Sequence, residues 1–119
     1  MELAGVTMAS DKHNYIDGRW VAGGSSRPSV NPSDISDIVG HFTEATPAQV
    51  GEAIAAARKA AGVWGVSPLE TRYKALMAIG DEICARSQEL GELLSREEGK
   101  PRAEGVGEVF RSGQFFQYF

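Results

Sequence analysis

The pattern of hydrophobic and polar positions divides the chain near residue 45. Before this point, short β-favouring runs alternate with turn residues, a pattern typical of strands. Asp17-Gly18 lies between two such runs. Because Asp-Gly readily adopts the positive φ angles of a two-residue turn, we expect Tyr15-Ile16 to pair with Arg19-Trp20 in a hairpin.

Two more strands are predicted before the pattern changes. We expect Gly23-Gly24-Ser25-Ser26 to form a loop and Arg27 to Val30 to form a short strand, which Asn31-Pro32 ends. Positions 38–42 then alternate between one face and the other, with Ile38, Gly40 and Phe42 on one side. This alternation predicts a further strand.

From Thr46 onward the apolar positions recur at helical spacing. Thr46-Pro47-Ala48-Gln49 has the form of a capping box with proline at the first helical position. The apolar face that follows is made by Val50, Ile54, Ala57, Ala61 and Trp64. Ser67-Pro68-Leu69-Glu70 repeats the start signal, and a second apolar stripe runs from Leu69 to Leu94.

The second stripe is too long for one helix in a compact chain. A continuous helix from Pro68 to Glu98 would be about 46 Å long, whereas a compact body of this mass is about 35 Å across. We therefore expect a break near Arg86-Ser87, where serine can cap a new helix. Gly99 and Pro101 predict a left-handed cap and a stop, followed by a helix from about Arg102 to the end.

Composition narrows the class of protein. The 119 residues are 42% hydrophobic and 24% charged, with a net charge of −4, as in a globular domain. Lysine and arginine do not cluster on one face, which argues against a nucleic-acid partner. No apolar run approaches the roughly 20 residues of a membrane helix, and residues 1–10 lack the features of a secretory signal. A cytoplasmic protein with no membrane partner is predicted.

Taken one by one, the candidate chemical groups favour structural roles. Cys84 lies on the apolar stripe, where a buried thiol is unreactive, and one cysteine makes neither a disulfide nor a zinc site. His13 and His41 have no partner at ligand spacing. The run from Gly105 to Phe110 begins like a dinucleotide fingerprint but lies inside a predicted helix, so it is interpreted as a false match. The run from Glu97 to Lys100 is interpreted as a solvated helix end.

The end of the chain is unusually aromatic. Half of the ten aromatic residues are Phe110, Phe115, Phe116, Tyr118 and Phe119. Gly105, Gly107 and Gly113 each cost about 1 kcal/mol of helix propensity, so this helix needs packing partners. Two hypotheses follow: a segment of a larger protein whose apolar surface meets protein beyond residue 119, or a small non-catalytic α+β module that docks a partner through this helix.

Together, the motifs resemble the opening of the NAD(P)-dependent aldehyde dehydrogenase superfamily. They occur in family order: Tyr15 to Trp20, Val30-Asn31-Pro32, Ala45 to Val50, Ala53 to Ala61 with Trp64, Pro68, Arg72, Glu98-Gly99-Lys100-Pro101, Glu104 and Glu108-Val109. The run from Arg96 to Val109 is similar to members that oxidise dicarboxylic semialdehydes such as 2,5-dioxopentanoate.

The resemblance implies an α/β fold and an incomplete chain. Residues 14–119 would form the N-terminal part of the cofactor-binding domain, a short β-hairpin and strand region followed by three or four helices flanking that domain, after a disordered tail at 1–13. In this family a cysteine thiolate attacks the aldehyde, hydride passes to NAD or NADP, and a glutamate and an asparagine assist.

All of these groups are expected downstream of position 119, so no catalytic, cofactor-binding or metal residue is assigned here. The resemblance also implies an aldehyde substrate and a homo-oligomer for the complete enzyme, and no activity for this segment alone.

Overall fold

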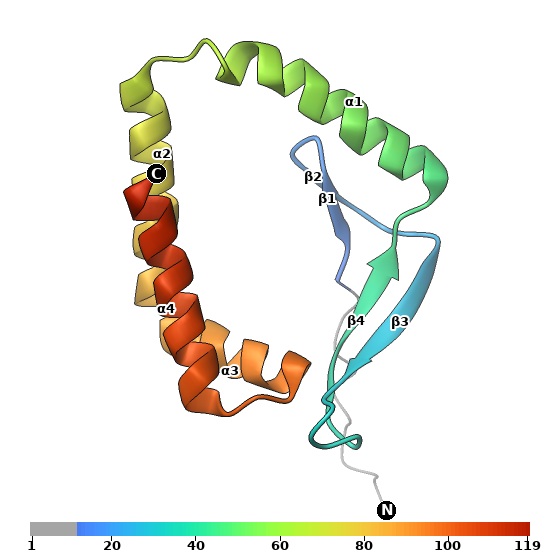
Figure 1. Ribbon diagram of the computed structural model, residues 1–119. Coiled ribbons are helices and arrows are strands. Elements are labelled where there is room, and N and C mark those ends of the chain that lie inside the picture. The colour runs from blue at the N-terminus through green and yellow to red at the C-terminus, as the bar shows by residue number, and fades with distance from the viewer. Residues whose placement is uncertain (1–11) are drawn as a thin grey trace, which may run out of the picture.

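A computed structural model of the chain describes residues 12–119 (Figure 1). In this range, strands precede helices, as the change of sequence pattern predicts. The strands are β1 (Asn14–Ile16), β2 (Arg19–Val21), β3 (Ser25–Val30) and β4 (Ile38–Glu44). The helices are α1 (Pro47–Trp64), α2 (Leu69–Ala85), α3 (Ser87–Glu98) and α4 (Arg102–Tyr118).

β1 and β2 form the predicted hairpin. Tyr15 pairs with Trp20 and Ile16 with Arg19, and the turn residues Asp17 and Gly18 both have positive φ angles, of 50° and 77°. The alternation of side chains places the Tyr15 and Trp20 rings together, 4.9 Å between centroids, on an exposed face. Ile16 lies on the opposite face, toward α1.

β3 and β4 form a second antiparallel pair. β3 begins at Ser25, two residues before its predicted start, because Ser25 and Ser26 pair with Glu44 and Thr43. The predicted Gly23 to Ser26 loop is thus wrong in its second half. Further along, Pro28 stands opposite His41, with a register shift between Ser29 and Val30.

Lys12 forms backbone hydrogen bonds with the edge of β4 that faces away from β3. The Lys12 amide donates to the His41 carbonyl at 2.7 Å, and the Lys12 carbonyl accepts from the Thr43 amide at 3.0 Å. A disordered tail is predicted for residues 1–13. Residues 1–11 lie outside the described residues, but Lys12 belongs to the sheet region rather than to a tail.

The start of α1 confirms the capping box. The Thr46 hydroxyl accepts from the Gln49 amide at 3.2 Å, and the Gln49 side chain accepts from the Thr46 amide at 2.9 Å. The predicted apolar face is nevertheless uncovered: α1 has no buried residue, and Val50 and Ile54 are 49% and 58% exposed. Local signals fix where this helix begins, but packing within the described residues does not cover it.

The helix boundaries are confirmed more often than the predicted caps. Ser67 does not cap α2; its hydroxyl donates to the Trp64 carbonyl at 2.7 Å, and Pro68 occupies the cap position. The break falls at Arg86 as predicted, with φ −98° and ψ 15°, but no serine side chain caps α3. Gly99 confirms the left-handed cap, with φ 70°.

Glycines bring the last three helices into close contact. α4 packs antiparallel to α2 and also contacts α3 (Figure 1). A Cβ added at Gly113 would lie 2.5 Å from the Cys84 sulfur and 2.8 Å from the Gly80 carbonyl oxygen. A Cβ at Gly91 would lie 2.4 Å from the Val106 Cα. The glycines that weaken α4 as an isolated helix therefore allow its packing.

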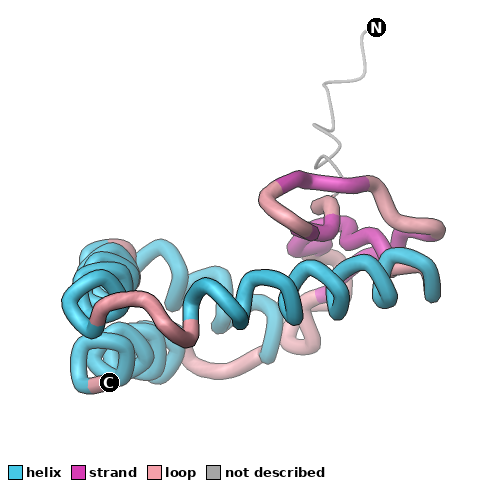
Figure 2. Tube along the Cα trace, turned by 90° about the horizontal axis from the view of Figure 1, so that it is seen from above, coloured by secondary structure: helices cyan, strands magenta, loops and turns pink. Residues whose placement is uncertain are grey.

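The described chain is not compact. It measures 61 × 37 × 24 Å with a radius of gyration of 17.9 Å, against about 13.5 Å for a compact chain of this length. Viewed from above, α1 runs from the strands toward the layered helices α2 to α4 (Figure 2). Among the described residues only one hydrophobic side chain, Ile16, is buried. The compact body assumed from the sequence is therefore wrong.

Candidate functional site

The clearest polar cluster joins the β3–β4 loop to the end of α3. The Arg96 guanidinium donates twice to the Asp37 carboxylate, at 2.9 and 2.6 Å, and the Asn31 side-chain amide donates to it at 3.1 Å. The hydrogen bond from Arg96, followed by that from Asn31, lowers the pKa of Asp37 from its usual 3.8 to about 2. This cluster ties two parts of the chain that are 59 residues apart.

The turn between α3 and α4 lies beside the same loop. The Ser33 hydroxyl donates to the Gly99 carbonyl at 2.9 Å. A Cβ on Gly99 would lie 2.9 Å from the Ser33 oxygen. The Lys100 ammonium contacts the carboxylates of Glu108 and, at 2.6 Å, Glu98; the hydrogen bond to Glu108 is the main cause of a raised Lys100 pKa. Within the run from Glu97 to Lys100, the Lys100 charge is thus paired at the end of α3.

Acid is expected to weaken the ion pair between Asp37 and Arg96. Because the folded pKa of Asp37 is below the unfolded one, its contribution to stability is present above about pH 4 and is lost as the pH falls toward about 2. The urea midpoint of the helical circular dichroism signal, measured between pH 5 and pH 2, should fall less steeply in Asp37→Asn than in the wild-type chain.

The exposed carboxylate Glu52 of α1 provides the matched control. Glu52→Gln should keep the wild-type slope. An unchanged slope in Asp37→Asn would show that the Arg96 contact does not contribute to folding.

The structure places the other candidate groups apart from one another. The Cys84 thiol donates to the Phe110 carbonyl at 3.6 Å and faces α4, in keeping with a packing role. His13 lies before β1 and His41 in β4. Within residues 12–119, no three His, Cys, Asp or Glu side chains gather where they would share a metal ion.

The glycine-rich runs do not fit a nicotinamide cofactor. Gly105 lies inside α4, where an added Cβ would meet the Gly91 carbonyl oxygen at 2.5 Å, so neighbouring backbone occupies the space a pyrophosphate would need. Gly23 is equally close to the Glu44 carbonyl, and Ser25 and Ser26 continue into a strand rather than a helix. The run from Gly105 to Phe110 lies inside α4, where the sequence pattern leads us to interpret it as a false match.

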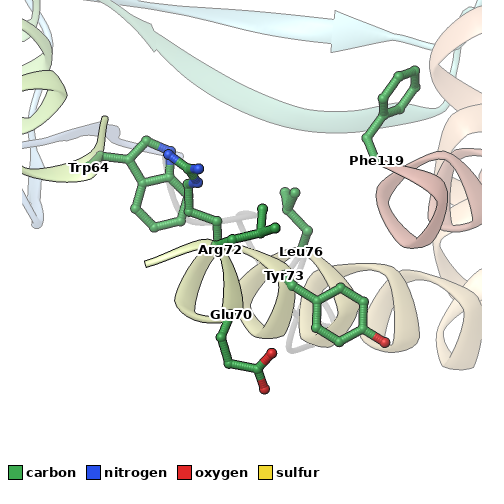
Figure 3. Close-up of a pocket in the computed structure, with 7 residues that line it drawn as sticks. Trp64, Glu70, Arg72, Tyr73, Leu76 and Phe119 are labelled. Carbon is green, nitrogen blue, oxygen red and sulfur yellow. The ribbon is translucent and has the colours of Figure 1, made fainter. Parts of the chain in front are cut away.

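An open hollow lies over α2, between the ends of α1 and α4 (Figure 3). It has a volume of about 650 Å³ and is lined by Trp64, Leu69, Glu70, Arg72, Tyr73, Leu76 and Phe119. The Arg72 guanidinium donates to the Gly65 carbonyl at 3.1 Å, which fixes the link between α1 and α2. The hollow carries no histidine, cysteine or paired carboxylates, so it lacks the groups of a catalytic site.

Sequence reasoning missed the Asp37–Arg96 pair and this hollow. Arg96 and Asp37 lie far apart in the chain, and neither belongs to a motif that predicts a partner. The turn residues Asn31 to Asp34 gave the only available signal, a loop between strands. The aromatic residues at the end of the chain did predict an uncovered apolar surface, and Phe119 is 84% exposed.

The comparisons with known proteins give one family. Residues 20–119 match the model of the aldehyde dehydrogenase family. A relative from Haloferax volcanii, an alpha-ketoglutarate semialdehyde dehydrogenase, is 33% identical over 94% of this chain and 24% of its own length. The chain belongs to the aldehyde dehydrogenase family, and it spans about a quarter of the length of that relative.

Solved structures agree in fold. An NAD-dependent aldehyde dehydrogenase from Sinorhizobium meliloti matches with a TM-score of 0.86 and 34% identity, over 92% of this chain and 23% of that one. An NADP-dependent glyceraldehyde-3-phosphate dehydrogenase from Bacillus halodurans, complexed with NADP, matches with a TM-score of 0.86 and 25% identity, over 92% and 23%. The α/β assignment from the sequence, strands followed by helices of this family, is confirmed.

No helix among the described residues is both long and apolar enough to cross a membrane.

Proposed function

We propose that this chain is the N-terminal segment of an enzyme that oxidises an aldehyde to a carboxylic acid with NAD or NADP. The observation that carries the proposal is the match of residues 20–119 to the family model, together with the fold shared with the Sinorhizobium enzyme. The two solved neighbours are named for NAD and for NADP, so the proposal leaves both cofactors open.

The proposed role of the segment is structural within that enzyme. Its described residues hold no candidate nucleophile free of packing and no cradle for a dinucleotide. They do offer rigid helices in close contact and large uncovered apolar faces. The segment thus supports the domain in which the remaining protein binds the cofactor, as part of an expected cytoplasmic homo-oligomer.

A dicarboxylic semialdehyde is the proposed substrate class. The Haloferax relative is named for such a compound, and the run from Arg96 to Val109 is similar to members with this substrate class. The complete protein should oxidise 2,5-dioxopentanoate with a kcat/KM at least about tenfold above that for hexanal, a difference of about 1.4 kcal/mol in activation free energy. A preference for hexanal would contradict the assignment.

The 119-residue chain alone is expected to show no aldehyde-dependent formation of NADH or NADPH. A chimera tests the enzyme origin: residues 12–119 replace the matching segment of the Sinorhizobium enzyme. The chimera should oxidise an aldehyde within about tenfold of its parent, while the parent without the segment should be inactive. Activity in the isolated chain, or a folded but inactive chimera, would count against the proposal.

A stand-alone interaction module is the weaker alternative. Only the exposed aromatic residues of α4 favour it, and the enzyme proposal accounts for them equally well. Family membership favours the enzyme.

A further inference from the structure

The turn of the β1–β2 hairpin carries an aspartate that nothing restrains. Asp17 and Gly18 make this turn beside α1, and both are exposed (Figure 1). Within residues 12–119, the Asp17 carboxylate forms no hydrogen bond or ion pair, and the Gly18 amide donates to no acceptor. Two groups that can react with each other are therefore adjacent in the chain and free of other partners.

The other aspartates of the described range are restrained. The Asp34 carboxylate accepts from the Ser36 amide at 3.0 Å and from the Ser36 hydroxyl at 2.6 Å. Asp37 is paired with Arg96, and the Asp81 carboxylate accepts from a side-chain amide of α4 at 2.8 Å. None of these three aspartates precedes a glycine. A free carboxylate and a following glycine coincide only at the hairpin turn.

The surroundings of the turn leave room for a ring to form there. The attacking atom would be the Gly18 amide nitrogen, and the lack of a side chain on glycine allows a close approach to it. A Cβ added at Gly18 would meet nothing within 4 Å. A hollow of about 290 Å³, lined in part by Asp17, Glu52 and Lys59, separates the turn from α1. No packed side chain therefore blocks the reaction.

The hairpin is also weakly held. β1 and β2 have three residues each and, in the described range, pair only with each other. A two-stranded hairpin of this kind is marginally stable in water, and Ile16 is its one buried side chain. Local opening of such a segment costs little free energy. Opening allows the Asp17 side chain to rotate toward the Gly18 nitrogen.

We propose that Asp17 is a site of spontaneous isomerisation to isoaspartate. The Gly18 nitrogen attacks the carbonyl carbon of the protonated Asp17 side chain. A C–N bond forms, and the amide proton and the carboxyl hydroxyl leave as water. A second water then hydrolyses the five-membered succinimide. Opening at the side-chain carbonyl restores aspartate, whereas opening at the main-chain carbonyl routes the backbone through the side-chain methylene, as isoaspartate.

Isoaspartate would release the hairpin from α1. It adds one carbon atom to the backbone of a turn whose two residues have φ angles of 50° and 77°. The pairing of Ile16 with Arg19 depends on a turn of two ordinary residues, so the longer backbone disrupts that pairing and the placement of Ile16. The reaction needs neither a cofactor nor a catalytic residue and is independent of the proposed function.

Ageing the 119-residue chain tests the proposal. The chain is held at physiological temperature in mildly acidic buffer, which favours loss of water from a carboxyl group, and is then digested with trypsin. Cleavage after Lys12 and Arg19 isolates residues 13–19, in which Asp17 is the only aspartate. A form of this peptide with unchanged mass and altered chromatographic retention should accumulate. It should accept a methyl group from protein isoaspartate methyltransferase, whereas deamidation of Asn14 would raise the mass.

Two variants and one internal site provide controls. Asp17→Glu would have to close a six-membered ring and should isomerise at least about tenfold more slowly, a barrier about 1.4 kcal/mol higher. Asp17→Asn keeps a residue suited to positive φ and should form the same succinimide faster, with loss of ammonia. Asp34, followed by the branched Ile35, should also isomerise at least about tenfold more slowly. No isoaspartate in residues 13–19, or as much at Asp34 as at Asp17, would overturn the proposal.

Amide hydrogen exchange tests the structural consequence. In isomerised molecules the amides of β1 and β2 should exchange at least about tenfold faster than in the fresh chain, because the hairpin opens more often. The amides of α3 and α4 should keep their rates. Isomerised molecules whose hairpin exchanges like that of the fresh chain would contradict the release of the hairpin from α1.

Discussion

Gly91→Ala is expected to destabilise the chimera by about 1–3 kcal/mol, the range for overpacking a close contact. The added Cβ would lie 2.4 Å from the Val106 Cα and 2.6 Å from the Val106 amide nitrogen. These are backbone atoms, so α3 and α4 must separate to admit the methyl group. Urea unfolding followed by circular dichroism measures the loss.

Gly107 is the matched control on α4. A Cβ there would meet nothing within 4 Å, so Gly107→Ala should raise stability by up to about 1 kcal/mol through helix propensity alone. A Gly91→Ala variant as stable as Gly107→Ala would show that α3 and α4 do not approach as closely as described.

Ile16→Ala is expected to release the hairpin from α1. Ile16 is the one buried hydrophobic side chain among the described residues, 8% exposed. Truncating a buried isoleucine costs about 2 kcal/mol or more. Amide hydrogen exchange in β1 and β2 of the isolated chain should accelerate by about 30-fold, the factor that corresponds to about 2 kcal/mol.

The same truncation at an exposed site controls for side-chain loss. Ile35, in the β3–β4 loop, is 85% exposed, and Ile35→Ala should leave the exchange rates of β1 and β2 unchanged. Equal acceleration in both variants would mean that Ile16 does not anchor the hairpin.

The features that sequence predicted correctly depend on a few adjacent residues. Asp17-Gly18 determines the hairpin turn, the Thr46 and Gln49 side chains cap α1, and Gly99 ends α3 in a left-handed conformation. Each is a local choice of backbone angles or of a nearby hydrogen-bond partner. The Ser67 cap was wrong: as a cap the Ser67 hydroxyl would accept from a backbone amide of α2, whereas in the structure it donates to the Trp64 carbonyl.

The features that sequence did not predict depend on residues far apart. Asp37 and Arg96 are separated in the chain by all of α1 and α2. Gly91 of α3 and Val106 of α4 are in contact only because α4 packs back against α3. Hydrophobic periodicity identified the apolar face of α1 and the stripe from Leu69 to Leu94, and the aromatic residues near the end of the chain marked α4, but none of these signals shows what lies against those faces. A compact shape was wrongly expected because these apolar faces stay exposed among the described residues.

Pro28 has a consequence for aggregation. The His41 carbonyl bonds to Lys12 on the far side of β4, so His41 and the opposing Pro28 form a non-bonded pair, and the backbone nitrogen of Pro28 points away from β4. Proline has no amide hydrogen to offer there. A strand from another molecule that added along β3 would therefore lack one bond of its ladder, which discourages growth of β-linked fibrils from this edge.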